Sequence, residues 1–139
     1  MSDTSTFLFV YGTLRPTFDN AFSQYLRQRA HYMGDGWFPG QLLDLGSYPG
    51  AVYDRTSSAT VRGTVYDIRK NSETVLTYLD YYEGVGSEFE SPTEYIRAIV
   101  PVRCKGTLID CWVYLYNHPS EDKTLIESGD YSHYLNQSR

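Results

Sequence analysis

The segment from residue 95 to residue 116 constrains the fold most strongly, because it predicts two neighbouring strands with apolar side chains on both faces. Lys105 and Gly106 suit a two-residue turn, which would place Cys104 opposite Thr107. One face of this register holds only apolar pairs, namely Ile96 with Leu115, Ala98 with Val113, Val100 with Cys111 and Val102 with Ile109. The other face holds Tyr95 with Tyr116, Arg97 with Tyr114 and Ile99 with Trp112. Because a shift of one residue would mix the two faces, we expect this register, in a closed barrel or in a sheet covered on both sides.

The length and composition fit one domain over residues 1–139. A chain of 139 residues with 41% hydrophobic residues can bury a single core without disulfides or metals. Its net charge of -5 and the lack of a Lys/Arg-rich run argue against a nucleic-acid partner. The apolar stretches are too short to cross a membrane, and residues 1–6 lack the pattern of a signal peptide. We therefore expect a cytoplasmic protein without a membrane partner. No feature of the sequence indicates an oligomeric state.

The cysteines and histidines do not form a metal-binding pattern. The sequence has two cysteines, Cys104 and Cys111, which cannot make a zinc site alone. The predicted hairpin separates them along the strands, which argues against a disulfide. Three histidines, His31, His118 and His133, are scattered without ligand spacing. We therefore expect no metal site.

The remaining elements follow from local patterns of apolar residues, caps and glycines. We expect a buried strand over residues 7–10 and strands near residues 51–53 and 61–68. The stretch 31–50, rich in glycine and aromatic residues, predicts a strand and an irregular loop, with another short strand at 42–45. Helices are predicted from a cap at Asp19 to about Ala30, from Ser72 to Glu83 with Asn71 or Ser72 as the cap, and after a cap at Asp130.

A glycine directly follows the first apolar strand, in the sequence Tyr11-Gly12-Thr13-Leu14. A glycine at this place lets the backbone bend or approach another group closely. It also leaves N–H groups free to bind an anionic or carbonyl oxygen. The alternative is an ordinary turn without a ligand.

The helix predicted over residues 72–83 places an acidic residue on its apolar face. At 100° per residue, Glu83 follows Leu76 and Leu79 on one face, while Asp80 lies at its edge and Tyr81 lies opposite. Desolvation on this face and the helix C-terminus both raise the pKa of a carboxyl group. Glu83 is therefore a candidate general acid–base residue. The alternative is a helix-end glutamate whose side chain extends into water.

Five short motifs, taken together and in this order, resemble the gamma-glutamylcyclotransferase-like family. They are Tyr11-Gly12-Thr13-Leu14, Tyr48-Pro49-Gly50-Ala51, Gly63-Thr64-Val65-Tyr66, Leu79-Asp80-x-x-Glu83-Gly84 and Tyr95-Ile96-Arg97. The resemblance covers roughly residues 7–116 and includes small bacterial and plant members of the family. It implies an α+β fold, a small mixed β-barrel with flanking helices, which agrees with the two-faced hairpin.

The resemblance also implies an enzyme that converts a small gamma-glutamyl amine or peptide to 5-oxoproline and a free amine, without a cofactor. Glu83 matches the catalytic carboxylate of the family. The turn formed by Tyr11, Gly12, Thr13 and Leu14 would bind the alpha-amino-acid end of the substrate.

Two further residues are candidates for substrate binding, and two other functions stay open. Arg97 could pair with Glu83 or with a substrate carboxylate, or it could stack on strand tyrosines; Tyr116 could supply a pocket hydroxyl. The same barrel could bind an amino-acid-like or anionic ligand without turnover, with Glu83 as the partner of an ammonium group. It could also catalyse a different acid–base reaction, because a fold does not fix the chemistry.

Overall fold

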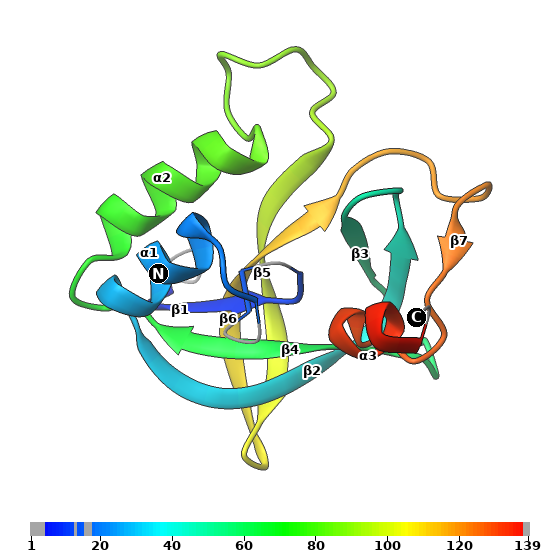
Figure 1. Cartoon of the computed structure of the whole chain (residues 1–139), viewed down its shortest axis with the longest axis horizontal. Helices are drawn as coiled ribbons and strands as arrows, with labels where there is room; N and C mark the ends of the chain where they lie inside the picture. Colours follow the sequence, from blue (N-terminus) through cyan, green and yellow to red (C-terminus); the bar gives the residue numbers. More distant parts are fainter. Residues whose placement is uncertain (1–4, 13, 16–17, 138–139) are drawn as a thin grey trace.

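The computed structural model describes residues 5–12, 14–15 and 18–137, and in this part of the chain five strands close into a mixed barrel (Figure 1). The strands of the barrel are β1 (Phe7–Val10), β2 (His31–Asp44), β4 (Thr60–Asp67), β5 (Tyr95–Cys104) and β6 (Thr107–Tyr116). They pair in the order β2-β4-β1-β6-β5, and a short pairing between β2 and β5 closes the ring. Only the pairing of β1 with β6 is parallel within this ring. The predicted small mixed barrel is confirmed.

The hairpin of β5 and β6 has the register that its sequence predicts. Cys104 faces Thr107 and Tyr95 faces Tyr116, with every pair between them in step. Cys104 and Cys111 are both buried free thiols. The apolar face of the hairpin packs inside the barrel, and its other face packs towards the helices. The two apolar faces of this segment therefore have one physical cause, which is burial on both sides of the sheet.

Strand β2 is much longer than the sequence predicts. Its first part pairs with β4, and its last residues pair with β3 (Pro49–Tyr53) and β7 (Thr124–Leu125). The strand expected in 31–50 is present, but it runs unbroken from His31 to Asp44 and includes most of the separate short strand expected at 42–45. Two glycines of β2 allow backbone geometry that larger residues would disfavour. Gly34 follows a bulge and has a φ of 146°. A Cβ on Gly36 would lie 3.0 Å from the Arg103 carbonyl oxygen, so glycine permits the close approach of β5.

Three helices of the described chain lie against the barrel: α1 (Ala21–Arg29), α2 (Ser72–Glu83) and α3 (Tyr131–Gln137) (Figure 1). The cap of α1 is Asn20, not Asp19 as predicted; its side chain accepts the Ser23 N–H at 2.8 Å. Asp130 caps α3 as predicted, by accepting the His133 N–H at 3.1 Å. No helix in the described part of the chain has the length and apolar character needed to cross a membrane.

Strand β1 has buried side chains on both faces, which places its C-terminal end at the boundary of two cores. Phe9 and Tyr11 belong to the core inside the barrel. Leu8 and Val10 belong to a second core, which also contains Leu26 of α1 and residues of α2. The end of β1 therefore lies between the inside of the barrel and the core that contains residues of α1 and α2.

Candidate active site

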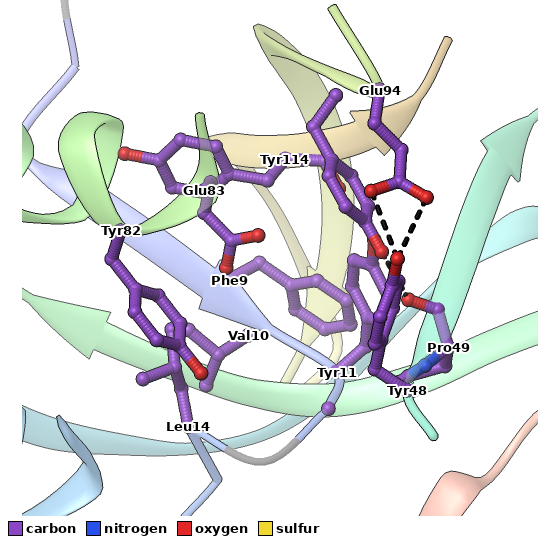
Figure 2. Close-up of a pocket in the computed structure, with 12 residues that line it drawn as sticks. Phe9, Val10, Tyr11, Leu14, Tyr48, Pro49, Tyr82, Glu83, Glu94 and Tyr114 are labelled. Carbon is purple, nitrogen blue, oxygen red and sulfur yellow. Dashed lines mark hydrogen bonds between the residues drawn. The ribbon is translucent and has the colours of Figure 1, made fainter. Parts of the chain in front are cut away.

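A cavity of about 310 Å³ lies where the end of β1 meets the end of α2 (Figure 2). Four of the predicted site residues line it, namely Tyr11, Gly12, Leu14 and Glu83. Thr13 lies outside the described residues. The other residues that line the cavity are Phe9, Val10, Tyr48, Pro49, Tyr82, Glu94, Tyr95 and Tyr114. A cavity of this size suits a small ligand.

Glu83 is the last residue of α2, and its carboxylate points into the cavity towards Phe9 (Figure 2). The helix is fixed in this orientation by Val75 and Leu79, which are fully buried. Gly84, with φ 72°, then ends the helix. Among the described residues, the Glu83 carboxylate has no hydrogen-bond or ion-pair partner.

The environment of Glu83 favours its neutral form. Burial, and to a lesser extent the negative charge of Glu94, together raise the pKa of Glu83 to about 7. The direction agrees with the expectation from the apolar helix face. The side chain keeps some contact with solvent through the cavity. A carboxyl group with this pKa can both accept and return a proton near neutral pH.

Tyr11 joins the walls of the cavity through its hydroxyl group. The hydroxyl donates to the Tyr114 carbonyl oxygen at 2.5 Å and accepts the Ala51 N–H at 3.2 Å. Burial and the nearby Glu83 charge hold the pKa of Tyr11 well above its usual value. Tyr11 therefore stays protonated and links β1 to β3 and β6.

The turn after β1 forms the wall beside Pro49. The Gly12 carbonyl oxygen accepts the Arg15 N–H at 3.1 Å. The N–H groups of Gly12 and Leu14 have no acceptor in the part of the chain that the structure describes. A Cβ on Gly12 would lie 3.1 Å from Pro49 Cγ, so a larger residue would crowd the site. Pro49 is itself fixed, because its carbonyl oxygen accepts the Tyr95 hydroxyl at 2.6 Å.

A second carboxylate, which no sequence pattern predicts, lies across the cavity from Glu83. Figure 2 shows Glu94 opposite Glu83, with its carboxylate directed at Tyr48. The Tyr48 hydroxyl lies 2.9 and 3.0 Å from the two Glu94 oxygens. Tyr48 is in one of the recognised motifs, but Glu94 stands just before a strand and has no periodic signal. Both side chains come from loops, whose positions depend on the closed barrel.

A groove of about 370 Å³ continues from the cavity along the loop after α2. It shares Glu83 and Glu94 with the cavity and is otherwise lined by Gly84, Phe89, Glu90, Ser91, Pro92 and Thr93. This groove gives a larger ligand space to extend beyond Glu83. No group of His, Cys, Asp and Glu in the described residues could hold a metal ion.

Arg97 and Tyr116 do not line the cavity. Arg97 pairs with Asp80, not with Glu83, and its Nε lies 2.8 Å from Asp80 Oδ1. Its guanidinium group stacks on Trp112, with Cζ 4.2 Å from the ring centroid, and not on a tyrosine. Tyr116 packs edge-on against Tyr95, with ring centroids 6.3 Å apart.

Comparison with known proteins agrees with this barrel and its motifs. The model of the family described as gamma-glutamyl cyclotransferase, AIG2-like, matches residues 8–133. The chain belongs to this family. The gamma-glutamylcyclotransferase family protein YtfP of Escherichia coli K12 is 34% identical over 125 residues, which cover 89% of this chain and 94% of YtfP.

Solved structures share the fold. The crystal structure of YkqA from Bacillus subtilis matches with a TM-score of 0.72 at 24% identity, over 98% of this chain and 44% of YkqA. This chain therefore spans less than half of YkqA. The crystal structure of an AIG2-like protein from Mus musculus matches with a TM-score of 0.71 at 23% identity, over 91% of this chain and 87% of the mouse protein.

Proposed function

We propose that the protein is a gamma-glutamyl cyclotransferase that releases 5-oxoproline and a free amine from a small gamma-glutamyl amine or peptide. The observation that carries this proposal is the Glu83 carboxylate. It points into a cavity of about 310 Å³, and burial brings its pKa to about 7. Family membership supports the reaction type, and the cavity is large enough for a gamma-glutamyl group.

The alpha-amine of the substrate is the nucleophile in this reaction, so the enzyme needs no nucleophile of its own. Glu83 takes a proton from the alpha-ammonium group. The amine nitrogen then attacks the gamma-carbonyl carbon of the same molecule and forms a five-membered ring. In the tetrahedral intermediate the ring nitrogen releases its extra proton to water. The bond to the leaving nitrogen then breaks, and protonated Glu83 gives its proton to that nitrogen. The products are 5-oxoproline and the free amine, and Glu83 is again ionised.

The turn of residues 11–14 has two tasks in this mechanism. It holds the alpha-amino-acid end of the substrate, and its N–H groups stabilise the oxyanion of the tetrahedral intermediate. The N–H groups of Gly12 and Leu14, which have no acceptor among the described residues, support the second task. Holding the substrate in a curled conformation contributes several kcal/mol, because the reacting atoms are then already close together.

The proposal is tested by incubating the protein with a panel of gamma-glutamyl amines and dipeptides and measuring 5-oxoproline. We expect product with at least one substrate, and a loss of about 100-fold or more in kcat for Glu83→Gln. The control is Glu73→Gln, the same substitution at an exposed position of the same helix, which should keep wild-type activity.

Two results would contradict the proposal. The first is a wild-type yield of 5-oxoproline that does not exceed that of Glu83→Gln on any substrate of the panel. The second is a rise in melting temperature with 5-oxoproline or glutamate without any turnover, which would favour a binding module in which Glu83 pairs with the ligand ammonium group.

A further inference from the structure

The side chain of Asp80 fastens the last turn of α2 to the barrel. Arg97 of β5 contacts it with two nitrogens, Nε at 2.8 Å and Nη2 at 3.2 Å. The buried Tyr114 hydroxyl of β6 donates to Asp80 Oδ1 at 2.7 Å. Both members of the ion pair are mostly buried, with 23% and 24% of their side chains exposed. A two-nitrogen contact with a buried third partner fixes direction as well as distance.

The backbone of Asp80 closes the turn that carries Glu83. The Val85 N–H donates to the Asp80 carbonyl oxygen at 2.8 Å, and the Gly84 N–H donates to the Tyr81 carbonyl oxygen at 3.2 Å. This pair of bonds is the usual way in which a left-handed glycine ends a helix. Asp80 is therefore bound to the barrel through its side chain and to the residues around Glu83 through its carbonyl group. Helix ends fray when they lack such contacts.

Tyr114 also contacts the opposite half of the site. Its hydroxyl binds Asp80, while its carbonyl oxygen accepts the Tyr11 hydroxyl at 2.5 Å. Arg97 is the direct cross-strand neighbour of Tyr114. Arg97 and Tyr114 thus hold the last turn of α2 through Asp80. Tyr114 also holds Tyr11, the first residue of the 11–14 turn.

We propose that Asp80, Arg97 and Tyr114 are positioning residues that set the place of the Glu83 carboxylate relative to the 11–14 turn. The inference rests on the proposed function, since the two elements they connect carry the base and the substrate-binding turn. A carboxylate must lie within hydrogen-bond reach of the proton that it accepts. A misplacement of about 1 Å can therefore cost up to about 100-fold in rate.

The test uses two variants that leave the net charge around Glu83 unchanged. Tyr114→Phe removes only the hydroxyl and keeps the carbonyl group that binds Tyr11. The double variant Asp80→Asn/Arg97→Gln removes both charges of the ion pair together. The matched control is Tyr81→Phe, which removes a hydroxyl from a side chain on the same helix that is 72% exposed. Because no charge is gained or lost in sum, a change at Glu83 reports its position and solvation.

Two readouts are measured, and one of them does not depend on activity. In the free protein, the pKa of Glu83 is measured from its carboxyl ¹³C shift. We expect it to fall in both variants by about half a unit or more towards the ordinary value, because a displaced carboxylate gains water. In the turnover assay, we expect kcat to fall roughly tenfold while KM changes little, because base placement acts on the chemical step.

The outcomes separate this inference from the proposed function. The positioning inference is overturned if folded Tyr114→Phe keeps both the wild-type pKa of Glu83 and the wild-type kcat. If the wild-type protein forms no 5-oxoproline, the proposed function fails, and the ¹³C titration alone decides the positioning inference. If the double variant does not fold, Tyr114→Phe decides the question, since it removes a single oxygen atom.

Discussion

At the scale of single residues, Glu83 differs from Asp80 and Glu94, the two carboxylates near it, in having no hydrogen-bond or ion-pair partner among the described residues. Asp80 has Arg97 and Tyr114, and Glu94 has Tyr48. Glu83 has none among the described residues and lies on a cavity wall. An unpaired carboxylate in such a place costs free energy of folding. Retaining a charge that destabilises the fold is typical of a functional residue.

Glu83→Gln should make the protein more stable at alkaline pH. The pKa of Glu83 is about 7 in the folded state, above the ordinary value of 4.5, so the folded state binds the proton more tightly. The stabilisation from this proton is complete below pH 4.5 and is lost as the pH rises through 7. In Glu83→Gln the side chain does not titrate, so the variant does not lose this stabilisation as the pH rises. We expect its advantage in unfolding free energy over wild type to grow by about 2 kcal/mol between pH 4.5 and 8.5.

Urea unfolding of both proteins at the two pH values measures this difference, since groups distant from Glu83 titrate alike in the two chains. The expected difference in unfolding free energy is smaller than the pKa shift alone would imply, because the Glu83 side chain keeps contact with solvent. An advantage that is the same at both pH values would mean that Glu83 is solvated like an ordinary glutamate.

The apolar helix face was sufficient to predict Glu83, but it did not predict the residues around it. The position of Glu83 depends on a local period of 3.6 residues. The partner of Arg97 depends on how far β5 lies from α2, which no local pattern contains. Glu94 and Tyr48 belong to loops that meet only when the barrel closes. Sequence alone therefore indicated the acid but left the partner of Arg97 open.

At the scale of elements, the motif Asp80-x-x-Glu83-Gly84 works as one helix end. Asp80 fastens the last turn, Glu83 extends into the cavity and Gly84 stops the helix. The limits of α2 were predictable because its apolar residues and terminating glycine are local signals. The full length of strand β2 was not predictable in the same way, because its glycines allow close contact with strands that are distant in the sequence.

Gly84→Ala should weaken the end of α2. A Cβ at this position would meet no atom within 4 Å, so its cost comes from the backbone φ of 72° alone. We expect a loss of about 1 kcal/mol in unfolding free energy, measured by urea unfolding. Gly84→Asn is the matched control and should lose less, because asparagine tolerates the left-handed region. Equal stability of the alanine variant and wild type would contradict this account of the helix end.

At the scale of the whole molecule, closure of the barrel creates the site. Parallel pairing of β1 with β6 and antiparallel pairing of β1 with β4 bury β1 on both sides and direct its C-terminal end towards α2. Closure also places Tyr11 against the backbone of Tyr114 and Ala51. The two-faced hairpin predicted such a barrel. The meeting of the 11–14 turn with Glu83 was implied by the family resemblance, because nothing in the local pattern relates segments so distant in sequence.

The central claim is that a desolvated Glu83 is the base that starts ring closure, and the pH profile of kcat/KM tests it most directly. The profile is measured between pH 5 and 8.5 as 5-oxoproline release from the best substrate of the panel. We predict a tenfold rise per pH unit at acidic pH and a plateau above pH 7, because the free enzyme must hold Glu83 ionised and its pKa is about 7. A profile that is flat across this range would contradict the claim.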